Sequence, residues 1–269
     1  MSKKIAFVFP GQGSQSVGML DAFGDNVAVK STLDEASAAL GEDVAQLIKA
    51  GPAEALSLTT NTQPVMLTMV RFRAQAMQEA VPVGTGGMAA ILGLDDPTVL
   101  KVCADAQAAS GEVVEAVNFN APAQVVIAGS KAGVEKACEL AKAAGAKRAL
   151  PLPVSAPFHS SLLKPASEKL SVYLQDKTFH APGLTVINNV DVAVVNDPVG
   201  IKDALIRQAA APVRWVETIQ EMAKLGVTHI VECGPGKVLA GLTKRIDPNL
   251  VGLSITDPAS IDQVMAELA

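Results

Sequence analysis

The stretch FVFPGQGSQ, Phe7 to Gln15, decides how the rest of the sequence is interpreted. An apolar run that begins at Ile5 stops at Pro10 and opens into a glycine-containing turn, which predicts a strand feeding a loop. In open α/β sheets, ligands bind at the carboxyl ends of the strands. The stretch therefore raises the question of which ligand such a loop would hold: a dinucleotide, a phosphate or a reacting acyl group.

The two nucleotide alternatives fit poorly. A dinucleotide fingerprint needs G-x-G-x-x-G, but its third glycine position is Ser16, and no acidic residue ends a second strand about twenty residues later. A phosphate loop needs Gly-Lys-Ser/Thr, which the chain lacks. Two interpretations remain: a turn whose backbone N–H groups, at Gly11 and its neighbours, hold a substrate oxyanion, and a glycine turn with no ligand.

The composition excludes several classes of protein. Hydrophobic residues make up 49% and charged residues 18% of the 269 residues, which is typical of a soluble globular protein. A net charge of −5 without basic runs argues against a nucleic-acid partner. No segment approaches the ~20 apolar residues of a membrane span, and the apolar run after Lys3 and Lys4 is too short for an export signal.

The three cysteines, Cys103, Cys138 and Cys233, are widely spaced and form no CxxC or Cys/His cluster. They are expected to be reduced thiols in a cytoplasmic protein, with a structural role in the core and no metal site.

Strand-like and helix-like runs alternate along the chain, which predicts an α/β protein with a mostly parallel sheet and helices on both faces. The first strand, Ile5–Phe9, is expected to be buried. Residues 84–153 follow the order β-α-β-β-α-β, typical of a ferredoxin-like α+β subdomain inserted in a larger body made of residues 1–83 and 154–269. The predicted helices of the larger body are Val27–Leu40, Asp43–Lys49, Gln63–Glu79, Leu162–Gln175, Ile201–Gln208, Val213–Leu225, Lys237–Ile246 and a last one from Ser260. Its other predicted strands are Leu184–Asn188, Val227–Glu232 and Val251–Ser254.

A second signal is PVSAPFHSSLLKP, Pro153 to Pro165, which places His159 in a loop between a strand and an amphipathic helix. A neutral imidazole there could act as a general base, although a lone loop histidine is more often only solvated. His180 and His229 show no such context.

Taken together, these stretches resemble the malonyl-CoA:acyl carrier protein transacylases of bacterial fatty-acid synthesis. The resemblance covers nearly the whole chain in family order. The segments that carry it are FVFPGQGSQSVGM, GPAEALSLTTNTQPVMLT, MQEAVPVGTGGMAAILGL, VNFNAPAQVVIAG, AKAAGAKRALPLPVSAPFHSSLLKPA, INNVDV and VECGPGKVLAGLTKRI. It implies a hydrolase-like α/β body that carries the ferredoxin-like subdomain.

The resemblance also implies a ping-pong acyltransferase, in which a serine takes malonyl from malonyl-CoA and passes it to the thiol of acyl carrier protein. The coenzyme A thioester is a substrate, and no cofactor is implied. His159 matches the base, and Gln208 matches the residue whose backbone carbonyl orients it in place of a triad acid. Gln12 matches an oxyanion-hole donor.

Two further residues match the substrate pocket. Arg73 matches the arginine that binds the free carboxylate of malonate, with Arg71 as the alternative if the register slips by two. A bidentate guanidinium would discriminate malonyl from acetyl, because acetyl leaves it unpaired. Asn120, in NFNAP, is expected to line the pocket, and the alternative for it is a simple turn residue.

One departure from the family is large. The nucleophile belongs to a GHSLGE elbow, but here TQPVMLTM runs directly into VRFRAQAMQEAVP, and no G-x-S-x-G occurs in the chain. Roughly forty residues, with the elbow strand and the serine, have no counterpart. No nucleophile is therefore present at the family position. Substitutes could only be Ser14, Ser160, Ser161 or Cys233, none of which is on an elbow.

Three hypotheses follow from this departure. The leading one is a malonyl transacylase by descent whose activity is crippled by the missing elbow. The second is a non-catalytic binder of coenzyme A thioesters or acyl carrier protein, and the third is a defective chain that folds poorly. Loss of a central strand would expose ladder groups and apolar faces of its neighbours.

Overall fold

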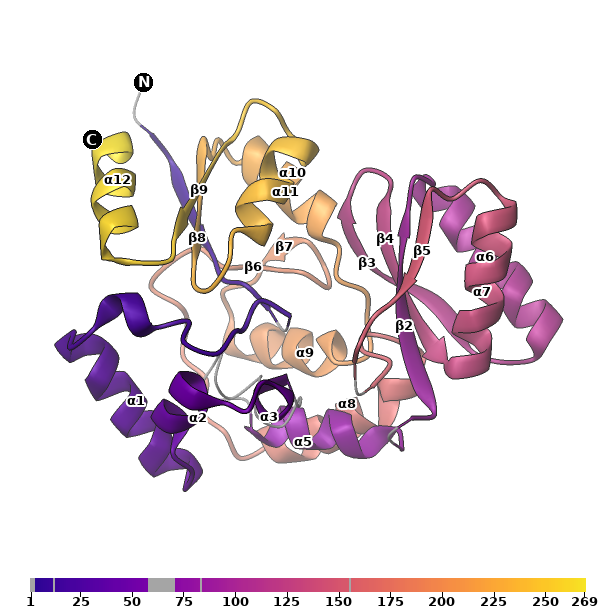
Figure 1. The fold of residues 1–269 in the computed structure, drawn as a ribbon, viewed down its shortest axis with the longest axis horizontal. Coiled ribbons are helices and arrows are strands. Elements are labelled where there is room, and N and C mark those ends of the chain that lie inside the picture. Colours follow the sequence, from indigo (N-terminus) through magenta and orange to yellow (C-terminus); the bar gives the residue numbers. More distant parts are fainter. Residues whose placement is uncertain (1–2, 12, 58–70, 83, 155) are drawn as a thin grey trace. The chain divides into compact units, whose positions relative to one another are not determined.

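The computed structural model describes residues 3–11, 13–57, 71–82, 84–154 and 156–269. The chain forms two compact units, Met1–Gln75 with Met222–Ala269, and Ala76–Glu221 (Figure 1). The predicted subdomain 84–153 lies wholly within the second unit. The segment TQPVMLTM and the Val70 that follows it lie outside the described residues.

The first unit contains a parallel sheet. Its strands β1 (Ile5–Val8), β8 (His229–Cys233) and β9 (Val251–Ile255) lie in the order β1-β8-β9. Helices α11 (Val238–Ile246) and α12 (Pro258–Leu268) both pack against β9, and Figure 1 shows them on opposite sides of the sheet. The prediction of a parallel sheet covered on both faces is confirmed for this part of the chain.

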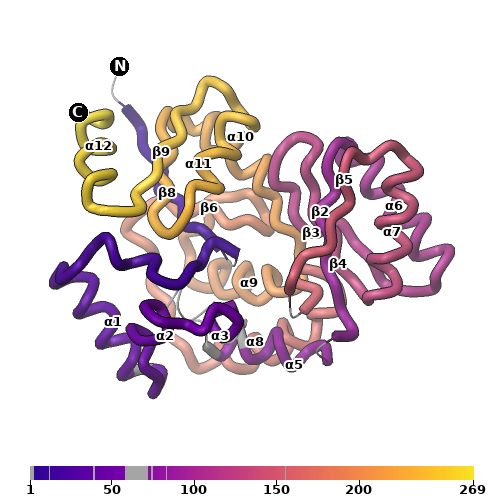
Figure 2. The backbone as a smooth tube through the Cα atoms, viewed as in Figure 1, coloured from indigo at the N-terminus to yellow at the C-terminus, as the bar shows by residue number. Residues whose placement is uncertain are grey.

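The other helices that lie wholly in the first unit include two that the sequence predicts, at residues 27–40 and 44–50, with bounds close to the predicted ones, and two that it does not predict. They are η1 (Asp21–Phe23), α1 (Val27–Leu40), α2 (Val44–Ala50) and α3 (Ala53–Ser57), and α1 packs against α2 (Figure 2). Local chemistry fixes their ends: the Asn26 side chain accepts hydrogen bonds from the first turn of α1, and Gly41 takes the left-handed conformation at its end. The predicted helix 63–79 is described only in part, as α5 (Arg71–Ala80), which crosses the boundary between the units.

The prediction that the first strand is buried is wrong. The exposed fractions of Ile5, Phe7 and Phe9 are 37%, 56% and 69%. Within the described residues β1 pairs only with β8, so it has one neighbour in the sheet instead of two. An apolar run predicts a strand covered on both sides, but the cover depends on neighbours that the run itself does not encode.

The second unit is built around an antiparallel sheet. Strands β2 (Gly86–Leu92), β3 (Val114–Ala121), β4 (Gln124–Ser130) and β5 (Arg148–Pro151) lie in the order β3-β4-β2-β5. Helices α6 (Asp96–Ser110) and α7 (Lys131–Ala143) complete the β-α-β-β-α-β order that the sequence predicts. The N-cap of α6 is Asp95, and its side chain accepts a hydrogen bond from the Thr98 N–H at 2.9 Å.

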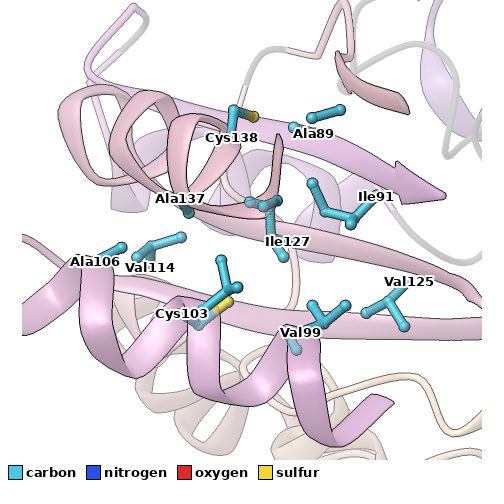
Figure 3. Close-up of a cluster of buried hydrophobic side chains, with 14 of the residues drawn as sticks. Ala89, Ile91, Val99, Cys103, Ala106, Val114, Val125, Ile127, Ala137 and Cys138 are labelled. Atoms are coloured by element: carbon cyan, nitrogen blue, oxygen red, sulfur yellow. The ribbon is translucent and has the colours of Figure 1, made fainter. Parts of the chain in front are cut away.

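Figure 3 shows the apolar core between this sheet and its two helices. Val125 and Ile127 of β4 and Ile91 of β2 meet side chains from α6 and α7, including the buried Cys103 and Cys138. The core contains two thiols and no disulfide, as predicted for structural cysteines.

The remaining elements of the second unit carry the candidate site. They are η2 (Ser161–Leu163), α8 (Lys164–Leu174), β6 (Ile187–Asn188), β7 (Ala193–Val194), α9 (Pro198–Gln208) and α10 (Trp215–Lys224), which ends in the first unit. The predicted strand Leu184–Asn188 is wrong in extent: only its last two residues form a strand, and they pair with β7 in a small hairpin. In the described part of the chain, no helix is both long and apolar enough to cross a membrane.

Replacing Ile127 with Ala is expected to destabilise the protein by about 2–5 kcal/mol, because the side chain is fully buried and its removal leaves a cavity in the core. Leu100→Ala on α6 is the control, since Leu100 is 51% exposed. Urea unfolding followed by circular dichroism measures both. Equal changes in the unfolding free energy would contradict this description of the core.

The three thiols are expected to differ in reactivity. Burial raises the pKa of Cys103 to about 12, so almost none of it is thiolate at neutral pH and its alkylation should accelerate only as the pH rises towards that value. Cys138 is also buried, whereas Cys233 is half-buried. Mass spectrometry after alkylation of the folded protein should show label first on Cys233, and all three should react at similar rates in denaturant. Fast labelling of Cys103 in the folded protein would contradict the packing in Figure 3.

Candidate active site

The glycine loop follows β1 at its carboxyl end. The Ser14 N–H donates to the Gly11 carbonyl at 3.3 Å, and the Gly13 N–H donates to the Gln15 side chain at 2.7 Å. Gly13 has φ +104, a conformation that other residues rarely adopt. Gly11 is exposed, and Gln12, the predicted oxyanion donor, lies outside the described residues.

A second glycine turn, Cys233–Lys237, packs against this loop. A Cβ atom on Gly234 would lie 2.7 Å from the Pro10 ring, and one on Gly236 would lie 3.9 Å from Ser14. The two turns meet because β1 and β8 are parallel neighbours, so their carboxyl ends lie at one edge of the sheet. The close approach explains glycine at position 234.

The second unit brings together two of the predicted residues, His159 and Gln208. The Nδ1 atom of His159 lies 3.1 Å from the backbone carbonyl oxygen of Gln208, 49 residues away in the chain. A carbonyl oxygen can only accept, so Nδ1 must carry the hydrogen. In the neutral ring, Nε2 then carries the lone pair with which a general base accepts a proton.

Gln208 is the last residue of α9, where helix carbonyls have no partner within the helix. The carbonyl end of a helix dipole also favours a nearby positive charge. The carbonyl can therefore orient the imidazole and stabilise its protonated form, as the acid of a triad would do.

The His159 backbone is in the left-handed region, with φ +64. A residue other than glycine in this region costs on the order of 1–3 kcal/mol and persists only where its surroundings hold it. Here the buried Ser160 hydroxyl donates to the Pro157 carbonyl at 2.7 Å. The Ser161 N–H donates to the Glu115 carboxylate of β3 at 2.7 Å. The loop is thus anchored immediately after the histidine.

Asn120 lies at an irregularity of β3. The register with β4 shifts between Phe119 and Ala121, so Asn120 is the extra residue of a bulge. Bulges often occur beside active sites, where they redirect a side chain. The adjacent residues of β3 also bond the segment after α9, with the Val213 N–H donating to the Val117 carbonyl at 2.8 Å. The strand of Asn120 and the segment of Gln208 are therefore joined.

Arg73 lies on α5 and is half-buried. Desolvation lowers the pKa of its guanidinium to about 10, because burial disfavours the charged form. The group is still protonated at neutral pH, and a carboxylate ligand would compensate part of this desolvation. Gly11 and Arg73 belong to the first unit, and His159, Gln208 and Asn120 to the second.

None of the substitute nucleophiles gains support from its surroundings. Ser160 is fully buried, with its hydroxyl bonded to Pro157. Burial and the neighbouring Glu232 raise the pKa of the Cys233 thiol, whereas an activated cysteine needs a lowered pKa. Among the described residues, no group of three His, Cys, Asp or Glu side chains is placed to hold a metal ion.

The residues that support the site were not predicted from the sequence. Glu115 anchors the histidine loop, and Arg207, next to Gln208, forms ion pairs with Asp191 and Asp203. The sequence did contain a signal for Asp191, which lies in INNVDV, one of the segments that resemble the family. The i, i+4 spacing of Asp203 and Arg207 on one helix was a second signal.

No family model matches the chain. Among curated proteins, the chain is 46% identical over 309 positions to the malonyl CoA-acyl carrier protein transacylase of Salmonella typhimurium, covering 98% of this chain and 99% of the relative. It is 40% identical over 309 positions to the Bacillus subtilis protein of the same name, covering 98% and 97%. Both alignments are 40 positions longer than the 269-residue chain, so each relative has at least that many residues without a counterpart here.

Solved structures give the same result. The acyl-carrier-protein S-malonyltransferase of Burkholderia pseudomallei is 62% identical with a TM-score of 0.95, covering 98% of this chain and 99% of that one. A malonyl-transacylase solved in complex with a type II PKS acyl carrier protein is 40% identical with a TM-score of 0.95, covering 98% and 100%. This chain therefore belongs to the malonyl CoA-acyl carrier protein transacylase family of acyltransferases.

Proposed function

We propose that this chain binds malonyl-CoA and acyl carrier protein, and that transfer of the malonyl group between them is its function by descent. The observation that carries the proposal is the hydrogen bond between His159 Nδ1 and the Gln208 carbonyl, because it leaves Nε2 able to accept a proton. In the proposed site, His159 is the base and Gln208 orients it.

The substrate groups are assigned to the remaining predicted residues. Gln12 donates its backbone N–H to the thioester oxygen, with Gly11 beside it in the same loop. Arg73 binds the free carboxylate of malonate, and Asn120 lines the pocket. Coenzyme A enters as part of the substrate, and the proposed chemistry uses no separate cofactor.

The proposal includes the finer description of the fold. The parallel sheet and its helices would form a hydrolase-like body of residues 1–83 and 154–269, and residues 84–153 a ferredoxin-like subdomain. The strand order β3-β4-β2-β5 supports the second assignment. Three free thiols support a cytoplasmic location.

The missing G-x-S-x-G favours a second candidate function. Without a serine on an elbow, the chain would hold the substrates but form no malonyl ester, which describes a non-catalytic binder of coenzyme A thioesters or acyl carrier protein. The two candidates share the binding residues and differ only in turnover.

Incubation with malonyl-CoA is expected to leave the intact mass of the protein unchanged, because the sequence has no G-x-S-x-G elbow to supply the serine that would be acylated. Intact-mass spectrometry checks this, and a relative that retains the elbow serine, treated in parallel, serves as the positive control. A stable malonyl adduct on this chain would refute the argument, and repeating the test with Ser14→Ala and Cys233→Ala would locate it.

Arg73→Ala is expected to weaken malonyl-CoA binding about 10- to 100-fold, the loss of a charge-assisted hydrogen-bonded pair. Acetyl-CoA binding should not change, because acetyl has no free carboxylate. Isothermal titration calorimetry measures both ligands. Arg148→Ala is the matched control, since Arg148 is exposed on β5. If the unmodified chain binds neither malonyl-CoA nor acyl carrier protein, both candidate functions fail.

A further inference from the structure

The carbonyl that contacts His159 belongs to the residue next to a bidentate ion pair. Arg207 donates from Nη1 and Nη2 to the two carboxylate oxygens of Asp191, each at 2.8 Å. Its Nε donates to Asp203 at 2.7 Å. The guanidinium is therefore bonded at all three of its nitrogens. A planar group bonded in this way has one orientation, unlike a lysine ammonium at the same place.

The two carboxylates bond Arg207 from different elements. Asp203 lies one turn earlier on α9, so its contact stays within the helix. Asp191 lies in the turn of the β6–β7 hairpin, so its contact joins that hairpin to the end of α9. Of these two contacts, only the one to Asp191 can help to fix where the end of α9 lies relative to another element.

The hairpin turn is itself held in place. The Asn188 side chain accepts hydrogen bonds from the N–H groups of Val190 at 3.1 Å and Asp191 at 2.7 Å. On the other side, the Thr218 hydroxyl of α10 donates to the Asn189 side chain at 3.2 Å. The turn thus contacts α9 before Gln208 and α10 after it. The turn therefore contacts the elements on both sides of the segment that carries the Gln208 carbonyl.

We infer that Asp191, acting through Arg207, is a positioning residue that fixes the Gln208 carbonyl opposite His159 Nδ1 and so selects the tautomer of the histidine. The pair is half-exposed, with side-chain exposed fractions of 42% for Arg207 and 35% for Asp191. Solvent screens a pair at this exposure in part, but its bidentate geometry still fixes the direction of the contact. The inference deepens the proposed function, since it rests on His159 as the base.

The test measures the tautomer of His159 itself. Long-range ¹H–¹⁵N spectra of the full chain with labelled histidine report the tautomer of each of its three rings, and a His159→Gln variant identifies the relevant signals. The unmodified protein should show His159 as the Nδ1–H tautomer. Asp191→Ala should lose this preference and give an average of the two tautomers.

Asp203→Ala is the matched control, because it removes the same charge from the same arginine but cuts only a contact within α9. Its His159 signals should match those of the unmodified protein. Arg207→Lys keeps the charge but loses the bidentate contact, and should behave like Asp191→Ala. If Asp191→Ala does not fold, Arg207→Lys decides the question.

Two results would overturn the inference: His159 of the unmodified protein in the Nε2–H form, or identical His159 tautomers in Asp191→Ala, Arg207→Lys and Asp203→Ala. The spectra need no substrate. A chain that fails to bind malonyl-CoA in calorimetry can therefore still show the tautomer selection, and the two failures are distinguishable.

Discussion

The candidate site depends on one hydrogen bond, from His159 Nδ1 to the carbonyl of Gln208. A backbone carbonyl brings no charge that needs a counterion, so the pair avoids most of the desolvation cost of a buried acid. In exchange, it has to be held in position by the fold, because the carbonyl cannot move independently of its helix. This requirement accounts for the left-handed backbone at His159, the Glu115 anchor on the loop that follows and the ion pairs at the end of α9.

The two units differ in how far they can tolerate a missing segment. In the second unit, the described sheet and helices of residues 86–151 enclose a continuous apolar core. In the first unit, β1 exposes Phe7 and has one described neighbour. Exposed apolar strands of this kind pair with other chains, so poor solubility would arise from β1 before it arose from the second unit.

Much of the fold could be predicted from the sequence because its signals are local. The bounds of α1 follow from Asn26 and Gly41, and the β-α-β-β-α-β order follows from alternating periods. The exposure of β1 and the short hairpin strand β6 could not be predicted, because Phe7 and Val186 belong to apolar runs whose burial depends on distant neighbours.

For the site, His159 stood out by its loop. Gln208 did not, since a backbone carbonyl has no side-chain signature, and only the family resemblance identified it.

The geometry also explains how a base can persist where the nucleophile is absent. His159, Gln208, Glu115, Asp191 and Arg207 all belong to the unit of residues 76–221, and the contacts described above that place them lie within that unit. The segment without a counterpart here would lie between TQPVMLTM and VRFRAQA. The elbow serine would have come from that segment. Without the segment, the proposed acyl acceptor is missing, while the proposed proton acceptor His159 and the Gln208 carbonyl keep their own contacts. A chain of this kind keeps the chemical features of its family at His159 even if it turns over no substrate.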